Sequence, residues 1–258
     1  MEDVFREAIK KIREAGAMIT ADSSAAIMNK GWQDYVTQRD IEVSDFLFDA
    51  LPKLLSGSVV ISEERKDRPC VTDEYTWIVD PIDGTSNFIF GMQLSAVSVG
   101  LLHKKKPIFG AVYNPFTNEL FHAKKGKGAF LNDTPIHVGE KEKLEDTIVL
   151  FETNPYSGRE RTDTRDVIHS IFQKCVDYRV TGAAALDICY IAAGRGCAFV
   201  SKQLAPWDFA GGLAILLEAG GKASGWKGEA LDFEGLQPVI ASNGKVHEEL
   251  LGLTAPFS

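Results

Sequence analysis

The segment Trp77-Ile78-Val79-Asp80-Pro81-Ile82-Asp83-Gly84-Thr85-Ser86-Asn87-Phe88 is the most informative stretch of this 258-residue chain. Its apolar residues predict a strand over residues 75–79, followed by two aspartates three positions apart, a glycine and a hydroxyl residue. Because the end of a strand is rigid, both carboxylates would be held in fixed positions. Carboxylates and a backbone carbonyl that converge at one point suit a hard divalent cation.

The residues after Asp83 predict an anion-binding element. Gly84, Thr85 and Ser86 can open a helix, whose free N–H groups would face an anion. A cation site beside an anion site points to phosphate chemistry. A simple turn is the alternative for Asp83-Gly84. A turn, however, does not need the proline, the paired aspartates and the threonine that follow this strongly apolar strand.

The composition is that of a globular protein with one domain or two closely packed halves, since 45% of the residues are hydrophobic and 25% are charged. The net charge of −8 argues against general binding to nucleic acids or anionic membranes. It permits an anionic small substrate, because bound divalent cations would reverse the local field. We find no signal peptide and no apolar run long enough to span a bilayer, so we expect a cytoplasmic protein without a membrane partner.

The periodicity of apolar residues predicts the order of the elements. Helices are expected near residues 4–19 and 41–54, and a meander of strands between residues 94 and 131. Beyond residue 140, helices and strands alternate up to a last helix near residues 245–253. This order predicts an α+β protein of layered sheets and helices, with a soft boundary near residue 140.

Three further acidic residues stand at the edges of predicted elements. Glu63 follows the buried strand 59–61, Asp208 opens a helix, and Asp40 begins another. Each also has a structural interpretation, because aspartate commonly caps a helix and Glu63 can belong to a solvated loop. Taken singly, the structural interpretation is favoured for Asp40 and Glu63, and the two interpretations of Asp208 are balanced.

The sequence resembles the inositol monophosphatase family, within the wider group of magnesium-dependent, lithium-sensitive phosphatases. Residues 80–85, continuing through Asn87-Phe88, are similar to the first signature of that family, and residues 207–212 are similar to its second. The resemblance continues in the segments 62–64, 126–130, 182–185 and 218–221 and covers nearly the whole chain. Both signatures in the right order form a highly specific match.

The resemblance implies a layered αβαβα fold of the inositol monophosphatase and fructose bisphosphatase type, with two to three Mg²⁺ ions. By position, the metal ligands would be the carboxylates of four residues and one backbone carbonyl: Glu63, Asp80, Asp83, Asp208 and the carbonyl of Ile82. Asp80 would bridge two ions. Oxygen ligands suit Mg²⁺, and the absence of histidine and cysteine from the motifs argues against zinc. The N-terminal half (residues 1–140) would carry most of these ligands. The C-terminal half (residues 141–258) would carry Asp208 and the residues on the substrate side.

The resemblance also implies catalytic and substrate-binding residues. Thr85 would pair with Asp40 and orient the attacking water, and Glu63 would share in activating that water. The implied substrate-binding residues are Gly84, Thr85, Ser86, Gly182, Ala184 and Ser201. Ser201 stands where inositol-specific members carry a glutamate that contacts the sugar alcohol, which leaves the preference for inositol open.

The implied activity is a cytoplasmic, Mg²⁺-dependent phosphomonoesterase that acts on a small polyol or sugar phosphate, with inositol 1-phosphate as first choice. Fructose-1,6-bisphosphatase and 3′-phosphoadenosine nucleotidase activities are the enzymatic alternatives. A catalytically silent member that serves as a regulatory or binding partner is the alternative from another class. The resemblance further implies a homodimer that binds no nucleic acid.

Overall fold

The computed structural model describes residues 1–21, 26–31, 34–65, 69–153 and 161–257. The helices are α1 (Glu2–Ala21), α2 (Gln38–Leu54), α3 (Thr85–Ile89), α4 (Arg161–Phe172), α5 (Ala184–Ala192), α6 (Pro206–Glu218) and α7 (His247–Thr254), with short 3₁₀ helices η1 (Leu144–Asp146) and η3 (Ala255–Phe257). The strands are β1 (Ile27–Gly31), β2 (Asp34–Thr37), β3 (Val59–Ser62), β4 (Tyr75–Asp83), β5 (Ala96–His103), β6 (Lys106–Asn114), β7 (Glu119–Lys124), β8 (Ala129–Leu131), β9 (Thr134–Ile136), β10 (Ile148–Phe151), β11 (Asp177–Arg179), β12 (Ala198–Leu204), β13 (Lys222–Ser224) and β14 (Gln237–Ser242).

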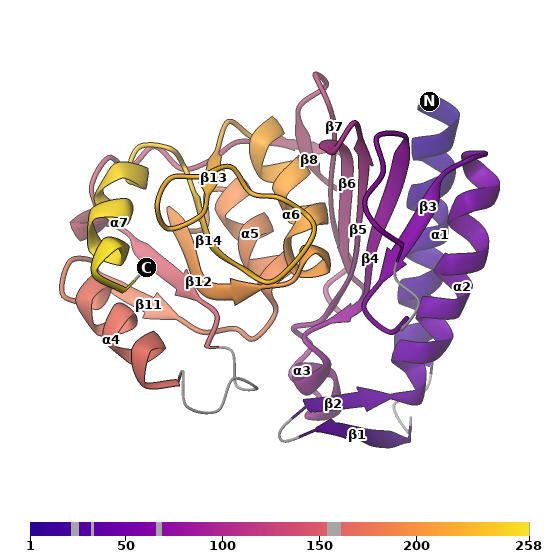
Figure 1. Ribbon diagram of the computed structural model, residues 1–258, viewed down its shortest axis with the longest axis horizontal. Helices are drawn as coiled ribbons and strands as arrows, with labels where there is room; N and C mark the ends of the chain where they lie inside the picture. The colour runs from indigo at the N-terminus through magenta and orange to yellow at the C-terminus, as the bar shows by residue number, and fades with distance from the viewer. Residues whose placement is uncertain (22–25, 32–33, 66–68, 154–160, 258) are drawn as a thin grey trace.

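The elements form five layers, in the order helix, sheet, helix, sheet, helix (Figure 1). Helices α1 and α2 cover one face of a large sheet, whose strand order is β3-β4-β5-β6-β7-β8-β9. Helices α5 and α6 lie between this sheet and a small sheet of order β11-β10-β12-β14-β13. Helices α4 and α7 pack on the outer face of the small sheet. This is the αβαβα arrangement that the resemblance implies.

Parallel and antiparallel pairs occur in the large sheet and in the small sheet, whereas β1 and β2 form a separate antiparallel pair. In the large sheet β3 runs parallel to β4, and the remaining neighbours are antiparallel, as a meander requires. In the small sheet β10 runs parallel to β11 and β12, while β14 runs antiparallel to β12 and β13. The large sheet ends at residue 136 and the small sheet begins at residue 148. The division of the chain into halves at residue 140 stays a prediction.

Apolar periodicity explains the outer helices. In α1, buried residues recur every three or four positions: Phe5, Ala8, Ile12, Ala15 and Ile19. They form one apolar stripe, which packs with the stripe of α2 on the large sheet. Among the described residues, none of the helices has the length and apolar character needed to cross a membrane.

Glycines allow α6 to lie unusually close to the large sheet. A Cβ on Gly110 of β6 would lie 2.2 Å from the carbonyl oxygen of Gly211, and a Cβ on Gly100 of β5 would lie 2.9 Å from Ala210. Any side chain at these two positions would therefore push α6 away from the sheet. The close contact matters for the site, because the first turn of α6 carries Asp208.

The structure corrects the sequence analysis at the decisive strand. The two aspartates do not follow the strand, because β4 continues through Asp83. The ladder to β5 pairs Asp80 with Ser98 and Asp83 with Ala96, and its register shifts between these two pairs. Pro81 lies within this irregularity and has no N–H to donate to the ladder. The bulge therefore lets both aspartates belong to one continuous, buried strand.

Candidate active site

The acidic residues predicted from distant parts of the chain meet around Asp80. Its side chain is buried on β4, and burial is the main reason why its pKa lies well above the ordinary value. The negative charges of four neighbours raise this pKa further: Glu63, Asp83, Asp208 and Asp40. These residues come from the end of β3, from β4, and from the first turns of α6 and α2. The fold thus gathers the predicted acids into one electrostatically coupled group.

The pKa values of Asp83 and Asp208 are raised in the same way as that of Asp80. Burial raises the pKa of each carboxyl to about 8, and backbone N–H donors lower it only in part. Asp83 lies in the large sheet, but its carboxylate accepts a hydrogen bond of 3.2 Å from the Leu186 N–H in the first turn of α5. Asp83 therefore joins the large sheet to the helices behind it as well as contributing charge to the site.

Asp40 and Asp208 hold equivalent positions in their helices. Asp40 is the third residue of α2, and its carboxylate accepts the Thr37 N–H at 2.8 Å. Asp208 is the third residue of α6 and accepts the Ala205 N–H at 2.8 Å. In α2 the capping box is complete, because the Asp40 N–H also donates to Thr37 Oγ1 at 3.3 Å. In α6 only the Asp208 half is present, because alanine has no side-chain acceptor. A carboxylate that accepts one N–H keeps further lone pairs, so the structural and functional interpretations of both residues are compatible.

Thr85 makes the contact with Asp40 that the resemblance implies. Its Oγ1 lies 3.1 Å from Asp40 Oδ1 and 3.1 Å from the carbonyl oxygen of Ile82. A hydroxyl has one proton and two lone pairs, so it can donate to only one of these acceptors at a time. The carboxylate is the stronger acceptor. Donation to Asp40 leaves the lone pairs of Thr85 free to accept a hydrogen bond.

The glycines beside Thr85 bring two loops together. Gly84 has a φ of +83°, and a Cβ there would lie 2.8 Å from the carbonyl oxygen of Leu94 and 3.1 Å from that of Gly182. Gly182 itself has a φ of +75°, just before Ala184 opens α5. The predicted phosphate-side residues, with Ser86 in the first turn of α3, therefore lie at two adjacent helix starts.

Ser201 is the predicted substrate contact on the small sheet, and that role stays a prediction. It is buried in β12, where the pairing with β14 shifts register between Ser201 and Leu204. Its Oγ lies 3.3 Å from both the carbonyl oxygen and the backbone nitrogen of Gln203. The hydroxyl is thus engaged in the local irregularity of its own strand.

Two acidic residues near the site were not predicted from the sequence. The charge of Glu152, which directly follows β10, raises the pKa of both Asp83 and Asp208. Asp187 in α5 is buried, accepts a hydrogen bond of 2.7 Å from Thr181 Oγ1, and has a pKa raised by burial and by the charges of Glu152 and Asp83. An acidic residue directly after a short apolar strand was the available signal for Glu152, because Glu63 shows the same pattern.

The donor set fits a magnesium ion in its chemistry. Within the described residues, no three His, Cys, Asp or Glu side chains form a group that could hold a metal ion as they stand. The carboxylates of Asp80, Asp83 and Asp208 instead accept backbone N–H groups. Burial, first, and the negative charges of neighbouring acids raise the pKa values of all three. Oxygen donors that repel one another suit a hard divalent cation.

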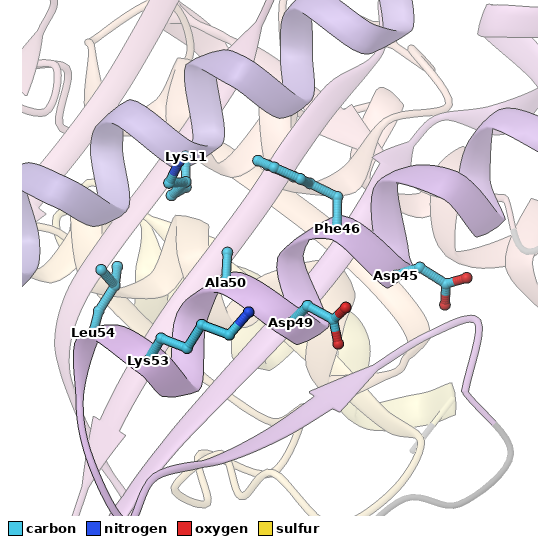
Figure 2. Close-up of a pocket in the computed structure, with 7 residues that line it drawn as sticks. All are labelled: Lys11, Asp45, Phe46, Asp49, Ala50, Lys53 and Leu54. Carbon is cyan, nitrogen blue, oxygen red and sulfur yellow. The ribbon is translucent and has the colours of Figure 1, made fainter.

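Two hollows in the surface lie near the helices that support the site. A groove of about 420 Å³ between α1 and α2 is lined by Lys11, Asp45, Phe46, Asp49, Ala50, Lys53 and Leu54 (Figure 2). A mostly apolar cavity of about 600 Å³ includes Ile61, two residues before Glu63, and Trp207, directly before Asp208. The second hollow therefore adjoins the segments that carry two of the acids.

Comparison with known proteins gives relatives over the whole length of the chain. The protein is 35% identical to "Inositol monophosphatase 3" of Solanum lycopersicum over 259 residues, which covers 97% of this chain and 96% of the relative. It is 33% identical to "Nus factor SuhB" of Escherichia coli strain K12, covering 97% and 95% of the two chains. An IMPase of Thermotoga maritima superposes with a TM-score of 0.89 at 29% identity, over 100% of this chain and 98% of the other.

Similar structures also include ligand complexes. SaIMPase-II has been described with inositol monophosphate (TM-score 0.83, 30% identity, 97% and 94% coverage) and with 2′AMP (TM-score 0.85, 31% identity, 100% and 96% coverage). An "IMPase/NADP phosphatase" complexed with Mg²⁺ and phosphate has a TM-score of 0.85 at 25% identity, over 98% of this chain and 94% of the other.

The model of the inositol monophosphatase family matches residues 1–256, which is nearly the entire chain. The match agrees with the layered fold, with both signatures and with the gathering of acids around Asp80. The chain therefore belongs to the inositol monophosphatase family, whose members are magnesium-dependent, and it is a phosphoric monoester hydrolase.

Proposed function

We propose that this phosphatase hydrolyses a small polyol or sugar phosphate, with inositol 1-phosphate as the first candidate, by means of a metal-activated water. One observation carries the proposal: the acids that surround buried Asp80 lie next to the hydrogen-bonded pair of Thr85 and Asp40. Negative charge that can bind a cation and a hydroxyl that can orient a water molecule thus lie in one site.

The residues proposed to hold two to three Mg²⁺ ions are Glu63, Asp80, Asp83 and Asp208, together with the carbonyl oxygen of Ile82. Bound Mg²⁺ would lower the pKa of a water molecule and stabilise charge on the leaving oxygen. Glu152 is an additional acidic neighbour, because its charge acts on Asp83 and Asp208. The carboxylates would carry less mutual repulsion with cations bound, so binding and folding favour each other.

The protein groups proposed to act on the water are Thr85, Asp40 and Glu63. Asp40 accepts the proton of Thr85 and so turns a lone pair of that hydroxyl outward. That lone pair would accept a hydrogen bond from the attacking water and orient its oxygen toward phosphorus. Glu63 would share in taking the proton that the water loses. The backbone N–H groups of Gly84 and Thr85 would hold the phosphate oxygens.

Substrate choice is the finer part of the proposal. The complexes of SaIMPase-II with inositol monophosphate and with 2′AMP support a small phosphorylated ligand. Ser201 stands where inositol-specific members carry a glutamate, and its hydroxyl donates a hydrogen bond to the Gln203 carbonyl. Phosphate release from inositol 1-phosphate, fructose 1,6-bisphosphate, 3′-phosphoadenosine phosphate and 2′-AMP ranks the candidates. Inactivity on inositol 1-phosphate with rapid turnover of fructose 1,6-bisphosphate would reverse the ranking.

A regulatory or binding role is the second candidate, because several relatives carry the name "Nus factor SuhB". Such a role does not require loss of activity, and the residues proposed for catalysis are all present. Turnover measured with and without Mg²⁺ tests whether the chain acts as an enzyme, whatever else it binds. Absence of phosphate release across the whole panel at millimolar Mg²⁺ would favour a purely regulatory or binding protein.

We also propose a cytoplasmic homodimer. Phe90 and Met92, just after α3, are 77% and 60% exposed, and Val180 is also exposed. The Asn87 side chain donates a hydrogen bond of 2.8 Å to the Thr181 carbonyl, which places the segment after α3 beside Val180. Exposed apolar side chains that gather in this way are typical of an interface. Light scattering should give twice the monomer mass for the wild type and the monomer mass for Phe90→Asp. A monomeric wild type would contradict the proposal.

A further inference from the structure

Arg65, two residues after Glu63, connects the Glu63 segment to helix α2. The Arg65 N–H donates to the Ser62 carbonyl at 3.2 Å, so residues 62–65 form a turn that contains Glu63. The Arg65 Nη2 lies 3.0 Å from Asp45 Oδ1, and its guanidinium carbon lies 4.1 Å from the centre of the Phe48 ring. Asp45 and Phe48 are three residues apart on α2 and therefore share one face of the helix.

A second contact connects the turn of residues 62–65 to α2. The hydroxyls of Ser44 on α2 and Ser62 at the end of β3 are both buried and lie 2.9 Å apart. On the other side, the Glu63 N–H donates to the Val79 carbonyl of β4 at 3.2 Å. The backbone of Glu63 is thus fixed to the large sheet, and the residues before and after it are fixed to α2.

Helix α2 consequently supports two acids of the site from different segments. Asp40 lies in its first turn, and Glu63 is held through Ser44, Asp45 and Phe48. Figure 2 shows Asp45 at one end of the groove between α1 and α2, with its carboxylate pointing away from Phe46 and Lys11. The carboxylate of Asp45 therefore points out of the groove.

We propose that Arg65 is a positioning residue for Glu63 and thereby sets the affinity of the protein for Mg²⁺. The proposal rests on the proposed function, in which Glu63 is a metal ligand. A ligand that is already held in place loses little conformational freedom when the ion binds. Groups that orient metal ligands typically change metal affinity by about 10–100-fold when they are removed. The planar guanidinium is suited to this task, because it pairs with a carboxylate and stacks on an aromatic ring at once.

The sign of the effect distinguishes positioning from simple electrostatics. Removing a positive charge near an acidic group should tighten the binding of a cation if only the long-range field matters. Removing the support of Glu63 should weaken it. Arg65→Ala therefore separates the two causes, whereas Asp45→Asn weakens binding on either account and serves to link the effect to this pair.

The test measures Mg²⁺ binding to the full-length protein by calorimetry and by the shift in Tm, with phosphate release as a third readout. We expect the Mg²⁺ dissociation constant to rise about tenfold in Arg65→Ala and to rise also in Asp45→Asn. Arg65→Lys should be intermediate, because it keeps the charge but loses the planar stacking group. The exchanged pair Arg65→Asp/Asp45→Arg should recover part of the lost affinity. At saturating Mg²⁺ the substrate KM should stay unchanged in every variant.

The matched control is Arg6→Ala, which removes an arginine that pairs with Asp3 on α1 at 2.6 Å and should leave Mg²⁺ binding unchanged. A folded Arg65→Ala protein that binds Mg²⁺ as tightly as the wild type, or more tightly, overturns the inference. If the wild type itself binds no Mg²⁺, the proposed metal ligands fail instead. If Arg65→Ala does not fold, Arg65→Lys decides the question, because it keeps the positive charge and loses the planar group: an Mg²⁺ affinity equal to that of the wild type then overturns the inference.

Discussion

At the scale of single residues, Thr85 concentrates the proposed chemistry in one hydroxyl. Thr85→Ala removes the donor to Asp40 and the acceptor for water, while every proposed metal ligand stays in place. We expect kcat to fall by about 10²-fold or more and the free energy of unfolding to fall by only about 1 kcal/mol. Steady-state kinetics and urea unfolding measure the two effects.

Thr85→Ser is the matched control, because serine keeps the hydroxyl and should retain most of the activity. An alanine variant that turns over at the wild-type rate would remove Thr85 from the mechanism. A variant that loses Mg²⁺ binding together with activity would instead show that the hydroxyl supports the metal site through the Ile82 carbonyl, which lies 3.1 Å away.

Asp83 combines a structural and a chemical role, and the variant Asp83→Asn separates them. The side-chain oxygen of Asp83→Asn can still accept the Leu186 N–H, but the buried negative charge is lost. Without Mg²⁺, the variant should therefore be as stable as the wild type or more stable, whereas turnover should fall by about 10²-fold or more. Chemical denaturation in a chelating buffer and phosphate release measure the two effects. A large loss of stability would mean that the anionic form is needed to bind α5.

At the scale of secondary structure elements, the contact between α6 and the large sheet sets the position of Asp208. Gly110→Ala would place a methyl group 2.2 Å from the Gly211 carbonyl oxygen, so α6 has to move. We expect a loss of about 1–3 kcal/mol in the free energy of unfolding, and weaker Mg²⁺ binding because Asp208 moves with the helix. Urea unfolding and Mg²⁺ titration measure these effects.

Gly252→Ala in α7 is the control for Gly110→Ala. A Cβ at Gly252 would meet nothing within 4 Å, so this variant should be as stable as the wild type or slightly more stable, by about 0.5–1 kcal/mol. Unchanged stability and unchanged Mg²⁺ binding in Gly110→Ala would show that the sheet and α6 can separate without disturbing the site.

The sequence predicted the longer elements well, because their apolar periodicity reflects burial directly. It did not predict β1, β2, β9 or β13, which are short strands of three to five residues. It also placed the end of β4 too early, since Pro81 and two aspartates are typical of a turn. A ladder that shifts its register around such residues depends on the partner strand β5, which a local pattern does not reveal.

The residues of the site that belong to a sequence motif could be predicted, whereas those that only the fold brings to the site could not. The segments of both signatures could be recognised in the sequence, and the Thr85–Asp40 contact followed from the resemblance. Glu152 has the same local pattern as Glu63, but that pattern does not reveal its relation to Asp83 and Asp208, which arises from the packing of the small sheet against α5 and α6. The buried position of Ser201 likewise depends on the shifted register between β12 and β14.

At the scale of the whole molecule, the site joins the large sheet to the helical layer behind it through mutually repelling groups. Glu63, Asp80 and Asp83 belong to the large sheet or its ends, whereas Asp208 is supplied by the helical layer behind it. Bound cations would therefore convert a destabilising junction into a stabilising one. The pH dependence of stability tests this directly.

In the protein without metal, the pKa values of Asp83 and Asp208 are raised from 3.8 to about 8. The folded state then binds more protons than the unfolded state between these values, so stability falls as the pH rises through this window. Buried His247 has the opposite effect, because its pKa is lowered from 6.5 to about 4 and its contribution is lost as the pH falls through that lower window. Above about pH 6.5, the slope therefore belongs mainly to the carboxyl groups.

We expect the Tm of the chelator-treated protein to fall between about pH 6.5 and pH 8, and saturating Mg²⁺ to remove most of that fall. Calorimetric scans at several pH values, with and without Mg²⁺, measure both slopes. Asp83→Asn should flatten the slope without metal, because one of the carboxyls with a raised pKa is gone, and a surface variant such as Arg6→Ala should not. A metal-free Tm that is constant or rises across this range would show that these carboxyls are not held in the folded state against their own repulsion, and the electrostatic basis for the cation site would be lost.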